Sequence, residues 1–337
     1  MLGPKARVPV QATGEFSETV PVPTGTRDLL PDELALERGI SLAVLEVFTE
    51  AGYREVATPA LEYEETMRLG DPRAAERAYH VTDNDGRSLV ARFDSTIPIA
   101  RMAATTLAAT EPPLRLCYLQ GVLRPIEPKR GQSREFLQVG MELLGREAPQ
   151  GDAEAIAVAC RVLEAAGIRD YRIAVGDSAL FGRLLDDAGL TSEKASRVRE
   201  AVMYELETRD MVGLGRELEA AGLEARQRDD LLALAQARGG VEQLDRPGVE
   251  HLRELAALLA ESGVDDRVIF DLGLIRSPTY YTGTVLEVYG AGFGSPLGGG
   301  GRYDDLVGRF GRDLTAFGFA LNMDRICRAR ELQGGVG

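Results

Sequence analysis

The sequence predicts an α/β (α+β) protein in which helices flank an antiparallel sheet and a mostly helical segment is inserted. Leu116–Leu123 and Arg134–Leu143 are apolar runs of strand length on either side of a polar loop, which is the pattern of a β-hairpin. Strand-like runs return at Val268–Leu272 and Tyr280–Tyr289. Between these two groups, residues 178–263 are dominated by Leu, Ala, Glu and Arg, which favour helices.

These patterns divide the chain into three parts. Residues 1–20 mix Pro, Gly, Ser and Glu without periodicity and are expected to form a flexible tail. Residues 21–177 and 264–337 are expected to form one core, and residues 178–263 a helical insertion large enough for a satellite domain. The insertion contains no catalytic spacing of residues, so the functional residues are expected in the core.

The composition narrows the class of protein. A hydrophobic content of 44% and a charged content of 27% are those of a soluble globular protein. No apolar run approaches the ~18 residues of a membrane-spanning helix. The N-terminus lacks the layout of a signal peptide, so a cytoplasmic location is expected. A net charge of -14 disfavours nucleic acid as a partner, because such binding rests largely on neutralising phosphates.

Histidine and cysteine usage excludes further classes. His80 and His251 are the two histidines, which rules out a histidine-rich metal site and disfavours a Ser/His/Asp triad. The three cysteines Cys117, Cys160 and Cys327 lie far apart and form no CxxC motif. We expect them to be reduced packing residues and expect no metal or cofactor.

The remaining elements follow from local signals. A helix is predicted over Asp32–Gly52, followed by a strand over Tyr53–Leu61 that Pro59 interrupts. An Asp-Gly step between Ala78–Thr82 and Ser88–Phe93 predicts a hairpin. Apolar periodicity and composition add helices over Ile97–Ala109, Asp152–Ala166 and Met323–Glu331, and strands over Tyr171–Val175 and Thr315–Leu321.

Three groups of residues allow both a functional and a structural interpretation. Asp94 and Thr96 stand where a strand ends and a helix begins, so they either hold a small zwitterion or cap the helix. Arg124 belongs to a cationic hairpin tip that can hold a phosphate or simply be solvated. The run Gly298–Gly301 permits either close approach to a ligand or unusual backbone angles, and it matches neither a Rossmann nor a P-loop motif.

Arranged in this order, the motifs resemble the catalytic core of class II aminoacyl-tRNA synthetases, specifically histidyl-tRNA synthetase, from Pro23 to Ile326. Arg92–Thr96 is similar to the R-P-E-G-T element of that family, with Asp94 where a glutamate grips the amino group of histidine. Leu123–Gln138 resembles motif 2, with Arg124 as the α-phosphate arginine, and Gly318–Ile326 resembles motif 3, with Arg325 as the ATP-binding arginine.

The histidine-specific elements are also recognisable. Leu274–Arg276 followed by Tyr280 and Tyr281 resembles R-G-L-D-Y-Y, and Gly300–Asp304 is similar to G-G-R-Y-D. Glu142 falls where a second amino-acid-binding acid is expected. The resemblance therefore implies a histidine pocket and a vestigial ATP site. The pocket residues would be Asp94, Thr96, Glu142, Arg276, Tyr280 and Tyr281, and the ATP-site residues Arg124 and Arg325.

The departures from the synthetase pattern point away from aminoacylation. Ile126 replaces the motif 2 acid, 277–279 read Ser-Pro-Thr instead of Gly-Leu-Asp, and Asn322 replaces the motif 3 glycine. Losing a hydrogen-bonding partner in a ligand site costs about 1–3 kcal/mol. The sequence also ends twelve residues after Arg325, without an anticodon-binding domain. We therefore expect a protein that does not charge tRNA.

One family of synthetase paralogues fits these departures, namely the regulatory subunits of ATP phosphoribosyltransferase. The resemblance implies no catalysis by this chain, self-association as a dimer, and a hetero-octamer with four short-form catalytic subunits. It also implies inhibition by histidine in the first step of histidine biosynthesis. The alternatives are a truncated histidyl-tRNA synthetase paralogue that activates an amino acid with ATP, and a structural subunit that binds no ligand.

Overall fold

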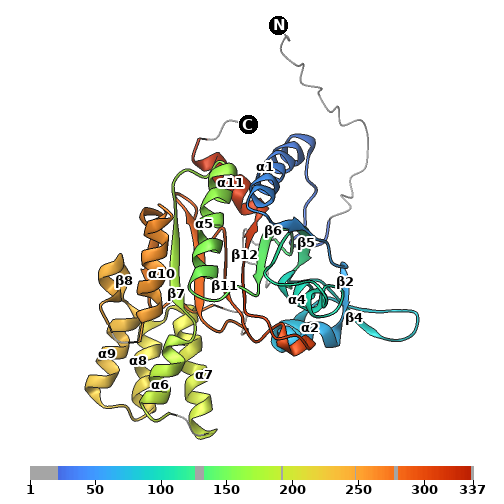
Figure 1. The fold of residues 1–337 in the computed structure, drawn as a ribbon. Coiled ribbons are helices and arrows are strands. Elements are labelled where there is room, and N and C mark those ends of the chain that lie inside the picture. The colour runs from blue at the N-terminus through green and yellow to red at the C-terminus, as the bar shows by residue number, and fades with distance from the viewer. Residues whose placement is uncertain (1–21, 126–132, 191–192, 247, 277–279, 335–337) are drawn as a thin grey trace, which may run out of the picture.

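The computed structural model describes residues 22–125, 133–190, 193–246, 248–276 and 280–334 (Figure 1). The predicted tail 1–20, most of the hairpin loop, and the departures at Ile126 and 277–279 lie outside these residues. No helix in the described part of the chain is long and apolar enough to cross a membrane.

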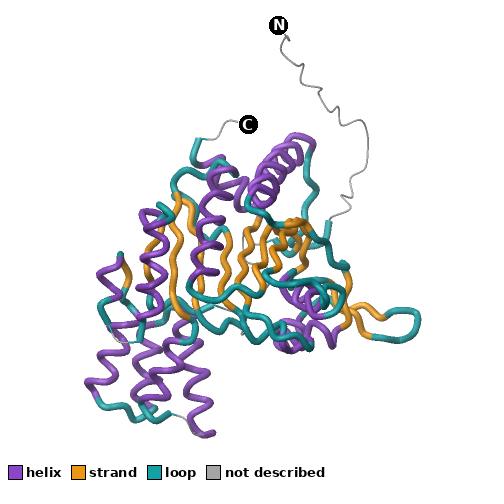
Figure 2. The backbone as a smooth tube through the Cα atoms, viewed as in Figure 1, coloured by secondary structure: helices purple, strands orange, loops and turns teal. Residues whose placement is uncertain are grey.

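A nine-stranded sheet runs through the centre of the described chain (Figure 2). Neighbouring strands are antiparallel except for the parallel pairs β1–β5 and β7–β9. In spatial order the strands are β1 Arg54–Glu55, β5 Leu114–Leu123, β6 Glu135–Leu144, β12 Ala316–Asn322, β11 Gly298–Arg302, β10 Thr284–Gly290, β7 Tyr171–Asp177, β9 Val268–Asp271 and β8 Arg238–Gly239. The predicted antiparallel sheet is thereby confirmed.

Alternation along the strands separates two hydrophobic cores. In β5, Cys117 packs into the larger core, whereas Leu116 and Tyr118 pack into the smaller one. The larger core joins the sheet to α1 Pro31–Glu50, α5 Gln150–Ala165, α10 Glu250–Glu261 and α11 Met323–Leu332. The smaller core joins it to α2 Glu64–Gly70, α3 Pro72–Arg77, α4 Thr96–Ala104 and the small sheet of β2 Leu61–Tyr63, β4 Ser88–Ala91 and β3 His80–Thr82.

Several predicted elements differ from the structure in their extent, among them the helix predicted over Ile97–Ala109, which ends at Ala104. The strand predicted over Tyr53–Leu61 is divided into β1 and β2, because the Pro59 carbonyl accepts a hydrogen bond from the buried Arg92 guanidinium instead of joining a ladder. The strand predicted from Tyr280 begins only at Thr284. Tyr280 and Tyr281 are thus released from the sheet and reach the cavity described below.

The glycine run forms strand β11, between β10 and β12. None of its glycines has a positive φ, so unusual backbone angles are not the reason for them. A Cβ at Gly300 would overlap the Gly318 carbonyl, and one at Gly299 would overlap the Arg276 guanidinium. The glycines therefore allow neighbouring groups to approach closely, and Gly299 leaves space for Arg276, a predicted site residue.

The segment 178–263 packs in two ways. Helices α6 Leu180–Asp187, α7 Glu193–Thr208, α8 Met211–Ala220 and α9 Ala225–Ala235 enclose a hydrophobic core of their own. We call these four helices the α6–α9 cluster, and they extend away from the sheet in Figure 1. The later part of the segment, with β8 and α10, joins the sheet and the larger core. The domain boundaries stay a prediction.

Asn322 caps helix α11. Its Oδ1 accepts a hydrogen bond from the Arg325 N–H at 3.1 Å. Asn322→Ala is expected to lower the free energy of unfolding by about 1 kcal/mol, the usual worth of an N-cap side chain. Asn322→Asp should keep the stability, because a carboxylate also accepts this bond. Urea denaturation of the three proteins checks this, and equal midpoints for all of them would contradict it.

Candidate functional site

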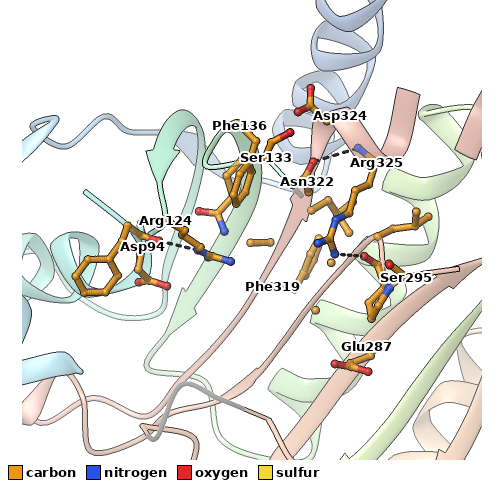
Figure 3. A pocket seen from close by; sticks show the side chains of 18 of the residues that line it. Asp94, Arg124, Ser133, Phe136, Glu287, Ser295, Phe319, Asn322, Asp324 and Arg325 are labelled. Carbon is orange, nitrogen blue, oxygen red and sulfur yellow. Dashed lines mark hydrogen bonds between the residues drawn. The ribbon is translucent and has the colours of Figure 1, made fainter. Parts of the chain in front are cut away.

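A cavity of about 1010 Å³ brings most of the predicted site residues together. Asp94, Thr96, Arg276, Tyr280 and Tyr281 line it, as do both predicted ATP-site arginines, Arg124 and Arg325. Their elements are far apart in the sequence, from the start of α4 to the first turn of α11. In Figure 3, Asp94 and Arg124 stand on one side and Arg325 and Ser295 on the other.

Asp94 is both a helix cap and part of the cavity wall, so the two interpretations of this residue are compatible. One carboxylate oxygen accepts a hydrogen bond from the Ile97 N–H at 3.0 Å, and the other accepts one from the Tyr280 hydroxyl at 3.2 Å. Burial raises the pKa of Asp94, and the Arg124 charge opposes that rise. A cation entering the cavity would favour the ionised carboxyl.

Glu142 does not line the cavity but lies behind the residues that do. Its carboxyl accepts hydrogen bonds from Thr96 Oγ1 at 2.7 Å and from the Tyr303 hydroxyl, and the residue is 1% exposed. Burial raises the pKa of Glu142 to about 8, although both hydrogen bonds oppose the rise. Glu142 is therefore largely protonated near neutral pH, and it supports two cavity residues instead of facing the ligand space directly.

Arg276 is held by an acid that sequence reasoning did not single out. Its Nη1 donates to Glu287 Oε1 at 2.8 Å, and the other Glu287 oxygen accepts from the Tyr289 hydroxyl. The Arg276 and Glu287 side chains are only 18% and 20% exposed. This partial burial makes the pair more than a solvated surface ion pair. Arg276 therefore has a fixed position in the cavity wall.

Arg124 and Arg325 bring further positive charge to the cavity. Arg124 Nε donates to the Phe93 carbonyl at 2.9 Å, and Arg325 Nη1 donates to the Pro296 carbonyl at 2.6 Å. Neither forms an ion pair with a carboxylate within the described ranges. Burial and the charges of Arg124 and Arg276 lower the pKa of Arg325. The cavity can therefore accept an anion by charge-assisted hydrogen bonds.

Two more cavity residues, Gln138 and Tyr303, lay inside recognised motifs but received no role from the sequence. Gln138 is 6% exposed, and its Oε1 has no hydrogen-bond partner in the structure, which leaves a buried acceptor at the cavity. The sequence signal that could have identified Gln138 was its polar side chain in the middle of an apolar strand. The part of the chain that is described contains no cluster of three His, Cys, Asp or Glu residues that could hold a metal ion.

Comparison with known proteins decides the family. The histidyl-tRNA synthetase family matches residues 25–326. The ATP phosphoribosyltransferase regulatory subunit of Symbiobacterium thermophilum is 41% identical over 327 residues, which cover 94% of this chain and 81% of the relative. The chain belongs to the ATP phosphoribosyltransferase regulatory subunits. The regulatory subunit of Moorella thermoacetica is 39% identical, over 92% of this chain and 82% of that protein.

Solved structures agree with this family. A Bacillus halodurans protein described as an ATP phosphoribosyltransferase regulatory subunit/histidyl-tRNA synthetase superposes with a TM-score of 0.84 at 31% identity, covering 93% of this chain and 83% of that one. Histidyl-tRNA synthetase from Nostoc superposes with a TM-score of 0.76 at 24% identity, covering 95% of this chain and 77% of that one, and shares the fold. The class II synthetase-like fold predicted from the sequence is confirmed.

Membership among the ATP phosphoribosyltransferase regulatory subunits also settles the general role. The chain is a non-catalytic, regulatory component of histidine biosynthesis, as the sequence predicted, and its role implies a catalytic phosphoribosyltransferase partner. The regulatory-subunit relatives do not support the alternative of an enzyme that activates an amino acid.

Proposed function

We propose that the cavity binds free histidine and that this binding lets the regulatory subunit inhibit its catalytic partner. The observation that carries the proposal is the arrangement of opposite charges in one cavity. Asp94 supplies a buried carboxyl, and Arg124 and Arg276 supply guanidinium groups. An amino acid at neutral pH carries an ammonium and a carboxylate, so it can satisfy both signs of charge at once.

Neutral hydrogen-bonding groups complete the proposed pocket. Thr96, Tyr280, Tyr281 and Tyr303 offer hydroxyls, and Gln138 offers a buried acceptor without a partner. A ligand that leaves such groups unpaired binds much more weakly than one that pairs them. This favours a polar side chain such as imidazole, which donates and accepts hydrogen bonds, over an apolar one.

We propose the remaining features of the assembly from the family resemblance. The partner is the short form of the catalytic subunit, the complex is a hetero-octamer of four regulatory and four catalytic chains, and the regulatory chains associate as dimers. The complex works in the cytoplasm. Histidine inhibits by binding more tightly to a less active arrangement of the complex, because only differential affinity can shift such an equilibrium.

We infer that Arg124 and Arg325 are remnants of a nucleotide site in the same cavity. Neither guanidinium forms an ion pair with a carboxylate in the described residues, which supports residual affinity for a phosphate-bearing ligand. A histidine titration by calorimetry with and without excess ATP tests this. ATP that raises the apparent Kd for histidine, or that gives a binding signal of its own, supports the remnant site. No signal from ATP contradicts it.

The function is tested by phosphoribosyl-ATP formation with the cognate short-form catalytic subunit. The rate is measured with and without this chain across a titration of histidine, and co-elution of the two chains is checked by size-exclusion chromatography. Activation by this chain followed by inhibition at higher histidine concentrations supports the proposal. No effect on the rate, together with separate elution, would overturn it. Histidine-dependent ATP–pyrophosphate exchange by this chain alone would instead favour an amino-acid-activating enzyme.

A further inference from the structure

One short segment, Asp271–Arg276, connects the α6–α9 cluster to the cavity. We call it the junction segment. It begins with the last residue of β9, and its two ends make contacts of different kinds. The first residue, Asp271, is bound by Arg209, which lies between α7 and α8, and by Arg238, which follows α9. The last residue, Arg276, lines the cavity.

Asp271 anchors the first end by charge. Arg209 donates to both of its carboxylate oxygens, at 3.1 and 2.7 Å, and Arg238 donates to one of them through Nε and Nη2, at 2.9 and 2.6 Å. The Asp271 side chain is 3% exposed, so its carboxylate depends on these bonds, whereas the Arg209 and Arg238 side chains are 33% and 55% exposed. Arg209 lies between α7 and α8 with a φ of 61°, a strained value for a residue with a side chain.

Steric contacts hold the middle of the junction segment. A Cβ at Gly273 would overlap the carbonyl of Ala235, the last residue of α9, so the two backbones lie in direct contact. Ile275 is 9% exposed and belongs to the hydrophobic core that the α6–α9 cluster encloses. Leu274 packs against Gly176 of β7, where a Cβ would overlap its side chain. Close-packed contacts of this kind transmit displacements instead of absorbing them.

The next residue, Arg276, enters the cavity. Its position is fixed by the ion pair with Glu287 and by close packing on Gly299. Ile275 and Arg276 therefore face two different environments, the core of the α6–α9 cluster and the cavity. A shift of the cluster that moves Ile275 must alter the geometry of the Arg276–Glu287 pair.

We propose that the α6–α9 cluster sets the ligand affinity of the cavity through the junction segment, with Asp271 and Arg209 as positioning residues for Arg276. This inference rests on the proposed function, because the ligand is taken to be histidine. Coupling of binding free energies is reciprocal, so histidine must in turn stabilise the contacts between the junction segment and the cluster. Occupancy of the cavity then becomes visible at helices that do not line it.

The experiment compares the unaltered chain with Asp271→Asn and the milder Arg209→Gln, which leaves the Arg238 bonds in place. Arg228→Ala is the matched control, because Arg228 lies in the same cluster and pairs with the exposed Glu219. The Kd for histidine is measured by calorimetry, and hydrogen exchange of α7 and α8 is measured with and without histidine. Circular dichroism establishes that each variant is folded.

We expect the Kd for histidine to rise at least about fivefold in Asp271→Asn and by a smaller factor in Arg209→Gln, and to stay unchanged in Arg228→Ala. Histidine should slow exchange in α7 and α8 of the unaltered chain, and this protection should be lost in Asp271→Asn. If Arg209→Gln folds but Asp271→Asn does not, a raised Kd for histidine and a reduced protection of α7 and α8 in Arg209→Gln support the inference.

Two outcomes separate this inference from the proposed function. If the unaltered chain binds histidine, but the Kd and the exchange pattern are the same in the folded variants, the junction segment does not couple the two regions. If the unaltered chain binds no histidine, the proposed function fails and the inference fails with it.

Discussion

Asp94→Asn is expected to weaken histidine binding by about 100-fold, because it removes the carboxylate that would pair with the ligand ammonium. Asparagine keeps the shape of the side chain. Its amide oxygen can still accept the hydrogen bond from the Ile97 N–H, and its NH₂ can donate to the Tyr280 oxygen. The fold should therefore survive, and the loss should appear in the Kd measured by calorimetry.

Asp83→Asn is the matched control for this substitution. Asp83 also accepts backbone hydrogen bonds through its carboxylate, from the N–H groups of Asp85 and Arg87, and it neither lines the cavity nor belongs to the α6–α9 cluster. Its replacement should leave the Kd for histidine unchanged. If both substitutions leave the Kd unchanged, the ammonium does not pair with Asp94 and the proposed orientation of the ligand is wrong. If both raise it equally, the effect is a general one of replacing a carboxylate that accepts backbone hydrogen bonds.

The position of Asp94 could be predicted because its signal is local. A short polar run between a strand end and a helix start is visible in the sequence whether or not the fold is known, and the resemblance to a synthetase motif gave it a role. Glu287 gave no such signal. It occupies an ordinary alternating position in β10, and only the approach of Arg276 from a distant segment makes it a partner.

Packing decided the points on which the sequence was ambiguous or misleading. The pairing of β5 and β6 could be predicted because two apolar runs of strand length lie on either side of one polar loop. The glycine run carries no side-chain pattern that could predict a strand. Its place between β10 and β12 depends on the close approach of neighbouring groups, which would overlap a Cβ at these positions. Glu142 was expected to face the ligand, but Thr96 and Tyr303 stand in between, and no spacing rule shows which of two nearby polar residues is in front.

The buried carboxyl of Glu142 also makes a prediction about stability. Its pKa is about 8 in the folded chain, against an ordinary value of 4.5, so the folded state holds the proton more tightly than the unfolded state does. Below pH 4.5 both states are protonated and the contribution to stability is fully present. As the pH rises from 4.5 to about 8, the unfolded state loses its proton first, and the contribution is lost.

Glu142→Gln removes this titration and keeps hydrogen-bonding groups for Thr96 and Tyr303. The free energy of unfolding of Glu142→Gln, taken relative to that of the unaltered chain, should therefore increase with pH. The increase should be up to about 1.4 kcal/mol per pH unit between pH 4.5 and about 8. Urea denaturation at several pH values between 5 and 8 measures the difference. Glu33→Gln is the control, because the Leu30 N–H and Arg27 lower the pKa of Glu33, so this residue titrates below the window and the difference for its variant should not change between pH 5 and 8. A difference for Glu142→Gln that does not change with pH would mean that Glu142 is ionised throughout, and that a fixed negative charge lies behind Thr96 and Tyr303.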